Sequence, residues 1–254
     1  EKVIELTVLG TQEAIKYEAA LKDLQALTGV EGAELDRLVS VEESLRVINV
    51  AGNEIVNTGP NILNALKLVG GAQPELLKNA EALGEVTKQA IVLSEASGDG
   101  LEPSVKALTT ILGQFNLPAQ DSGRIINELA AGAKEGAAEI PQITDSLREF
   151  GTVAKIVNVS TSESIALIEV LAENQLKGAE AGTQLRNVLA KLASAEILPK
   201  PAQAAFEKYG VNVKLLSDAT QPLSVRLTEL AKLQGDVAAQ VKVFGLENLQ
   251  AATI

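Results

Sequence analysis

Apolar residues recur along most of the chain at three- and four-residue intervals, the spacing of one face of an α-helix. Leu21, Leu24 and Leu27 are an early example, and Gly29 follows them. Glycine commonly stands directly after the last turn of a helix. Similar runs, separated by glycine and proline, continue through the rest of the chain. The pattern predicts many helices of about 10–20 residues joined by short turns.

Two early segments indicate where the next helices begin. Val41–Ser44 predicts the start of a second helix, with Leu45, Ile48 and Ile55 on one face. A break is expected at Asn57–Pro60, because proline lacks an N–H and restricts the residue before it. The same proline suits the first turn of the helix that follows.

The remaining aliphatic runs predict helices around residues 62–69, 76–93, 105–115, 125–129, 140–153, 165–171, 185–192, 202–209 and 223–243. The last of these is expected as one helix or as a pair interrupted at Gly235. The fold class is therefore predicted to be all-α, a compact bundle of about ten helices with short Gly/Pro turns. Residues 1–56 are more charged and are expected to form an N-terminal helical segment. Residues 57–254 are expected to form one core helical domain.

Three glycine or valine segments predict local departures from this helical pattern. Gly132 and Gly136 predict a loose stretch, Gly178–Gly182 predicts a turn, and Val211–Val213 is compatible with an extended segment. Before the aliphatic run that begins at Ile165, Ser160 or Thr161 and the residues after it match an N-cap signal.

Composition narrows the possible functions. Aromatic residues make up only 2% of the 254, so the core is built from Ala, Leu, Val and Ile, which suits close helix packing better than a deep pocket. A net charge of −11 repels phosphates, so no specific nucleic-acid binding is expected. No apolar run reaches the roughly 18 residues of a membrane-spanning helix.

The chain contains no Cys and no His. Thiolate metal sites, disulfides and nucleophile–histidine pairs are therefore excluded. Paired carboxylates such as Glu42-Glu43 are interpreted as solvated helix faces, and Ser97–Gly100 lacks the ligand spacing of a calcium loop. Ser–Lys pairs stay open. We expect no catalytic, cofactor-binding or metal-binding residues, and no enzyme.

The glycine-containing stretch Gly178–Thr183 has no phosphate-binding lysine after it and follows a helix rather than a strand. A P-loop is therefore not supported. We interpret this stretch as a joint in which small residues let two helices approach closely.

Asn174–Leu192 reads NQLKGAEAGTQLRNVLAKL and contains the pattern A-G-T-x-L-R, and Phe244–Asn248 reads FGLEN. In this order, the two motifs resemble the A-G-T-x-L-R helix and the closing F-G-x-E-N of the core region of phage and prophage tail tape measure proteins. Phe115–Leu129, Phe150–Ala166 and Tyr209–Val211 are similar to segments between or before them. The ordered match runs from about Ile55 to the last residue.

The resemblance implies structural roles for the motif residues, namely Gly178, Gly182, Thr183, Leu185, Arg186, Phe244, Gly245, Glu247 and Asn248. Gly178 and Gly182 are expected at turns or close approaches, Thr183 as a possible cap and Phe244 as a packing anchor.

The resemblance also implies a function in the virion tail, assembled in the bacterial cytoplasm. A tape measure protein sets tail length, takes part in tail tube assembly and can help genome delivery. Its partners would be the tail tube protein and tail assembly chaperones, with self-association and host membrane contact at infection also open. The alternative function is a membrane-active helical module, motivated by the apolar, Ala-rich helices. A peptidoglycan hydrolase is the least favoured alternative.

Overall fold

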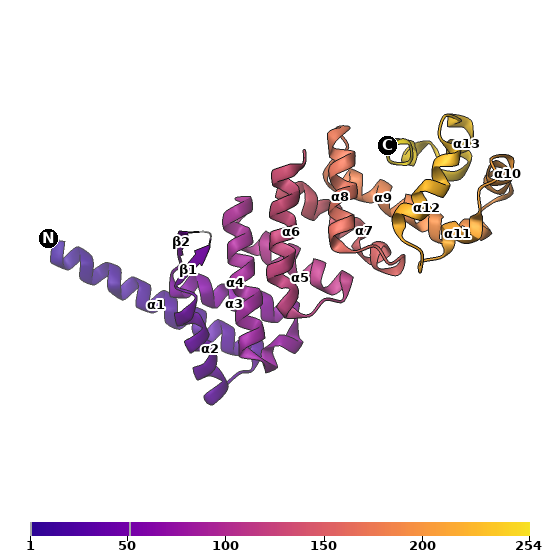
Figure 1. The fold of residues 1–254 in the computed structure, drawn as a ribbon. Coiled ribbons are helices and arrows are strands. Elements are labelled where there is room, and N and C mark those ends of the chain that lie inside the picture. The colour runs from indigo at the N-terminus through magenta and orange to yellow at the C-terminus, as the bar shows by residue number, and fades with distance from the viewer. Residues whose placement is uncertain (1, 51) are drawn as a thin grey trace. The chain divides into compact units, whose positions relative to one another are not determined.

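The computed structural model describes the backbone of residues 2–50 and 52–254, and the side chains of 11–50 and 52–254. In these residues it contains fourteen α-helices, five short 3-10 helices and one two-stranded sheet (Figure 1). The all-α fold class is thereby confirmed. The α-helices are α1 (Lys2–Thr28), α2 (Ala33–Ser44), α3 (Gly59–Ala72), α4 (Ala80–Ser97), α5 (Leu101–Phe115), α6 (Ser122–Glu135), α7 (Ile140–Ile156), α8 (Thr161–Glu173), α9 (Gly178–Ala193), α10 (Lys200–Lys208), α11 (Val213–Ser217), α12 (Leu223–Leu230), α13 (Val237–Phe244) and α14 (Leu249–Thr253). The 3-10 helices are η1 (Pro74–Lys78), η2 (Ala119–Asp121), η3 (Ala195–Ile197), η4 (Ala231–Leu233) and η5 (Leu246–Asn248).

The chain divides into two units, each with its own dense internal contacts. The first comprises the residues up to Leu112 together with Leu117–Ile126, and the second comprises Gly113–Asn116 together with Asn127–Ile254. Helices α5 and α6 therefore each contribute to both units. The boundary expected between residues 56 and 57 falls inside the first unit, and that division stays a prediction.

The first unit is organised around α3 and α4. Helix α1 packs along α3, and α2 packs on α4. Leu24, Leu66 and Leu83 are among the fully buried residues that these helices place in the core. Pro60 stands in the first turn of α3, as its sequence predicts, because a residue at that position needs no N–H partner.

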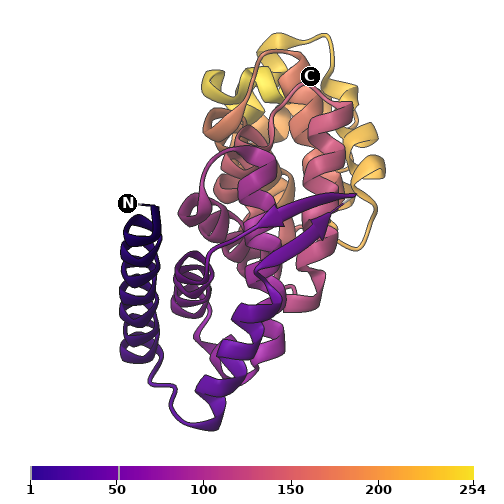
Figure 2. The ribbon, with the colours of Figure 1, turned by 90° about the vertical axis from the view of Figure 1, so that its left-hand side faces the viewer.

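The prediction that a helix begins at Val41 is wrong. Val41–Ser44 forms the last turn of α2, and the chain then makes a β-hairpin of β1 (Val47–Val50) and β2 (Asn53–Val56) (Figure 2). Ile48 faces Ile55 in the antiparallel register. The apolar residues of this segment are nearly all β-branched, which favours strands, and a short run of them fits either period.

In the second unit, α7 and α9 form the most extensive helix pair, and α8 packs against both. Helix α8 begins with a capping box: the Ser160 hydroxyl accepts a hydrogen bond from the Glu163 N–H at 3.2 Å, and the Glu163 carboxylate accepts one from the Ser160 N–H at 2.9 Å. These two bonds satisfy N–H groups that have no partner inside the helix. The N-cap predicted before Ile165 is confirmed.

Two other local predictions hold only in part: Gly136 lies in a bend after α6, and Asn212 is extended. Gly132 lies inside α6, which continues to Glu135, because Ile165 of α8 packs directly against the glycine and supports the helix there. Val213 is not extended but begins the short helix α11, which Asn212 caps by accepting a bond from the Leu215 N–H at 3.2 Å.

A buried arginine fixes the end of α7. Arg226 of α12 is fully buried and donates hydrogen bonds to the carbonyls of Leu216, at 2.8 Å, and Val157, at 2.9 Å. Burial lowers the pKa of Arg226, because the charged form loses its hydration. Carbonyls at helix ends carry partial negative charge, so they stabilise the guanidinium, and the Asp218 carboxylate also favours its charged form. Arg226 thereby joins α11 and α12 to the end of α7.

The capping box gives the first testable prediction. Replacing Ser160→Ala removes an N-cap acceptor and is expected to lower the free energy of unfolding by about 1 kcal/mol in urea denaturation. Thr152→Ala is the matched control, because Thr152 is exposed in the middle of α7. The control is expected to change stability by less than about 0.5 kcal/mol. Equal losses in the two variants would contradict the capping role.

Candidate functional site

Helix α9 is the scaffold on which most of the predicted motif residues lie, and its close approach to α7 depends on Gly182. A Cβ atom added at Gly182 would lie 2.4 Å from the Ser146 carbonyl oxygen and 2.8 Å from Glu149 Cβ, both in α7. Side chains do not tolerate contacts of this length with backbone atoms. Gly182 therefore lies where two helices approach closely, and its role as a motif residue stays a prediction.

The predicted turn at Gly178–Gly182 is wrong, because these residues form the first turns of α9. Gly178 itself has φ +61°, so the reversal is confined to the start of the helix. Its carbonyl accepts a hydrogen bond from the Ser146 hydroxyl at 2.7 Å, which fixes the helix start to α7. Thr183 is not a cap: it is the sixth residue of α9, and Lys177 occupies the N-cap position.

Leu185 and Arg186 lie on different faces of α9. Leu185 is 4% exposed and belongs to the core. Arg186 lies 3.5 Å from Glu149 of α7, with both side chains partly exposed. An ion pair in contact with water contributes little to stability, about 0–1 kcal/mol. The Arg186–Glu149 pair therefore adds little to the free energy that holds α7 and α9 together.

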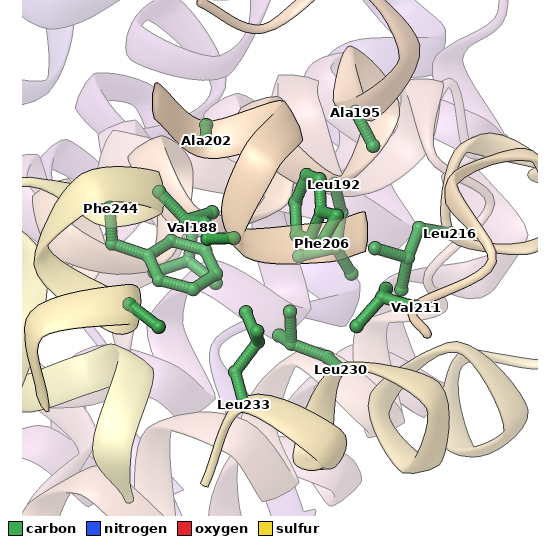
Figure 3. Close-up of a cluster of buried hydrophobic side chains, with 13 residues drawn as sticks. Val188, Leu192, Ala195, Ala202, Phe206, Val211, Leu216, Leu230, Leu233 and Phe244 are labelled. Carbon is green, nitrogen blue, oxygen red and sulfur yellow. The ribbon is translucent and has the colours of Figure 1, made fainter. Parts of the chain in front are cut away.

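Phe244 is 1% exposed and lies in a core cluster at the C-terminal end of the unit. Figure 3 shows Phe206 and Phe244 among the aliphatic side chains of this cluster. Its buried members are Val188, Leu192, Ala195, Ala202, Ala205, Phe206, Val211, Leu216, Leu230, Leu233, Ala239, Val243 and Phe244. The members come from α9, from the helices up to α13 and from the segments between them. Phe244 is thus packed in the core, and its role as a motif residue stays a prediction.

Gly245 follows Phe244, and the chain turns there in a backbone conformation that only glycine adopts readily. Gly245 has φ +79° and ψ 164°, a region closed to residues with a Cβ. The turn ends α13 and starts the short helix η5, which contains Glu247 and Asn248. A glycine is therefore required between the anchor Phe244 and the polar residues of the motif.

Asn248 closes this turn against α9. It is 2% exposed, and its amide nitrogen donates to the Phe244 carbonyl at 2.8 Å and to the Glu247 carboxylate at 3.1 Å. Its amide oxygen accepts a bond from Asn187 Nδ2 at 2.8 Å. Lys191 Nζ donates to the same Phe244 carbonyl at 2.6 Å. We call Phe244–Asn248 with these α9 partners the FGLEN corner.

The α9 partners of the corner were not identified from the sequence. Gln184 accepts a bond from the Ala251 N–H at 3.1 Å, and Asn187 and Lys191 hold the corner itself. The three residues are spaced i, i+3 and i+7, so they share one face of α9. That spacing was visible in the sequence, but a polar stripe on a helix is more often a solvated face.

A second polar contact fixes the start of α13. The Asp236 carboxylate caps α13 by accepting a bond from the Ala239 N–H at 3.0 Å, and it also accepts bonds from the Tyr209 hydroxyl and, at 3.0 Å, from Lys208. These bonds, that of Tyr209 first, hold the pKa of Asp236 well below its usual range, because they stabilise the charged form. Tyr209 belongs to the Tyr209–Val211 motif.

The chemistry available around the corner is hydrogen bonding and packing. Across residues 11–50 and 52–254, no three acidic side chains meet in a way that could hold a metal ion. In the same part of the chain, none of the helices has the length and apolarity needed to cross a membrane.

Residues 71–250 match the family described as phage-related minor tail proteins, which is more than half of the chain. The chain belongs to this family. The match includes α4 to α13 and ends two residues after Asn248, so the FGLEN corner lies within the matched region. Membership places this minor tail protein among the components of phage tails.

Two curated relatives carry more specific names. The tape measure protein of Pneumococcus phage Dp-1 is 23% identical over 218 residues, covering 85% of this chain and 18% of the relative. The probable tape measure protein of Escherichia phage P2 is 25% identical over 237 residues, covering 89% of this chain and 27% of the relative. The resemblance inferred from the ordered motifs is thereby confirmed, and the minor tail protein segment spans less than a third of either relative. No solved structure matches it significantly.

The close approach at Gly182 gives the second prediction. Gly182→Ala places a methyl group against the α7 backbone and is expected to destabilise this minor tail protein by about 1–3 kcal/mol, measured by urea denaturation. The control is Gly113→Ala in α5, where an added Cβ has no atom within 4 Å. That variant is expected to be stabilised by up to about 1 kcal/mol. Tolerance of Gly182→Ala would show that α7 and α9 do not need their close contact.

The low pKa of Asp236 gives the third prediction. Because the folded-state pKa lies below the unfolded value of about 3.9, the capping contact stabilises the fold above that pH. The contribution is lost as the pH falls from about 4 toward the folded-state pKa. The difference in unfolding free energy between the native chain and Asp236→Asn should therefore shrink between about pH 5 and pH 2. A difference that is constant with pH would contradict the assignment.

Proposed function

We propose that this chain is a folded helical segment of a tape measure protein, which acts in tail length determination and tail tube assembly. The observation that carries the proposal is the family match over residues 71–250, together with the printed names of the two relatives. The motifs lie in the expected order inside that match, and they build packing contacts such as Gly182 on α7 and the FGLEN corner on α9.

The role is proposed to be structural rather than catalytic. The motif residues form a packed core and a hydrogen-bonded corner, and the chain has neither the histidine nor the cysteine on which most nucleophilic and acid–base sites depend. A structural segment needs only specific helix contacts, which the close approach of α7 and α9 supplies.

The partners are proposed to be other tail proteins, specifically the tail tube protein and the tail assembly chaperones. Assembly is proposed to take place in the bacterial cytoplasm, with the finished protein in the virion tail. An acidic chain with a net charge of −11 suits a role among proteins better than direct binding to phosphate groups.

The fourth prediction concerns tail length. In the full-length parent gene, an in-frame deletion of the codons for residues 127–254 removes 128 residues. If the parent chain spans the tail as α-helix, tails should shorten by about 190 Å, at ~1.5 Å per residue. Duplicating the same codons should lengthen them by a similar amount. Electron microscopy of negatively stained particles measures both.

The matched control replaces the same codons with an unrelated helical sequence of equal length, which is expected to keep tail length unchanged. The duplication covers the case in which the deletion prevents assembly. Tails of native length from both the deletion and the duplication would contradict a tape measure role for this segment.

A further inference from the structure

The outer face of α8 differs from an ordinary solvated helix face. Helix α8 (TSESIALIEVLAE) carries apolar residues on nearly every side, and such helices are normally covered all round. Yet Ala166 is exposed, and Val170 is 46% exposed. Helices α7 and α9 cover the inner side of α8. Its outer side therefore presents an apolar ridge without a partner among the described residues.

A groove of about 380 Å³ lies beside this ridge, between α8 and the part of α6 that belongs to the second unit. Its lining includes small or aliphatic residues, among them Ala131, Ile165 and the ridge residue Ala166. Gly132 and Gly136 bring the two helices close together here, since a Cβ at either position would collide with Ile165 or Glu169 of α8.

Carboxylates line both walls of the groove. Glu128 and Glu135 stand two turns apart on α6, and Glu169 and Glu173 stand one turn apart on α8. The Glu128 carboxylate accepts a bond from the Thr161 hydroxyl at 2.5 Å, and Glu135 lies 3.6 Å from its exposed neighbour Lys134. The groove thus combines an apolar lining with an acidic rim.

Glu169 is the second and independent sign of a missing partner. It is 9% exposed, and one of its carboxylate oxygens accepts a bond from the Ala138 N–H at 2.9 Å. Its other oxygen, Oε1, is buried and has no hydrogen-bond partner in the described part of the chain. A buried carboxylate that lacks a cation or a full set of donors is costly, and an incoming ammonium or guanidinium group would offset that cost.

We infer that the groove between α6 and α8 is a docking site for an amphipathic α-helix of a partner protein, with an aliphatic stripe and flanking Lys or Arg residues. The apolar lining fits an aliphatic helix face, as in other helix-in-groove complexes. The carboxylates on both walls favour positive charge beside that face, and their spacing of one or two turns matches residues four or seven apart on a helix. The inference does not depend on the role in tail length.

The test uses the 254-residue chain and two designed 21-residue helical peptides labelled with a fluorophore. One peptide has a Leu/Ala stripe flanked by Lys residues at four- and seven-residue spacing, and the other has Glu in place of each Lys. Fluorescence anisotropy should show binding of the Lys peptide at least about tenfold tighter than that of the Glu peptide.

Two variants at exposed positions locate the site without disturbing the core. Ala166→Lys places a positive charge in the groove lining and is expected to weaken binding of the Lys peptide by at least about tenfold. Glu173→Gln removes one rim charge and is expected to weaken it about two- to fivefold. Glu180→Gln, an exposed change on α9 outside the groove, is the matched control and should leave the affinity unchanged.

The inference would be overturned if the Lys peptide did not bind, if the two peptides bound equally, or if Ala166→Lys did not reduce the affinity. Spermidine serves as a small cation without an apolar face. If spermidine binds as tightly as the Lys peptide, the groove binds cations alone, and the docking of a helix is rejected.

Discussion

The close contact between α7 and α9 is the constraint on which the rest of the second unit depends. Gly182 lets the α9 backbone approach that of α7, and the Ser146 hydroxyl fixes the start of α9 through the Gly178 carbonyl. A side chain at Gly182 would separate the helices, and interiors packed as densely as protein cores cannot absorb such a shift locally. The axis of α9 then determines where its other faces point.

The FGLEN corner uses one of those faces. Asn187 and Lys191 of α9 can reach the corner only because Phe244 anchors its beginning in the core and Gly245 turns the chain back toward α9. The bond from Asn248 to the Phe244 carbonyl is buried, and those from Asn187 and Lys191 are partly buried. Bonds of that kind cost little while they are complete and much when one partner is lost. The FGLEN corner can therefore form only when α9 is held in place by its contact with α7.

The same unit also leaves a face uncovered. Helix α8 is covered by α7 and α9 on its inner side, while its outer side keeps an apolar ridge beside an acidic groove. A buried, half-satisfied carboxylate such as Glu169 is unusual in a completed interior. This segment is proposed to belong to a longer tail protein. The outer side of α8 is the face on which we infer that a partner helix binds.

The sequence by itself determined the helical class, the stop at Pro60, the cap at Ser160 and the exclusion of histidine and cysteine chemistry. These features depend on residues a few positions apart, so local spacing is sufficient to read them. The hairpin around Ile48 was missed, because a short β-branched run fits either period.

Only the tertiary structure decided which residues meet across long separations. The Asn187–Asn248 bond joins residues 61 positions apart, and Glu169 reaches the Ala138 N–H across 31. On the isolated α9 helix, Asn187 and Lys191 look like parts of a solvated face. Their role arises from the angle and register at which helices pack, and those are set by the shapes of whole helix faces rather than by any local pattern.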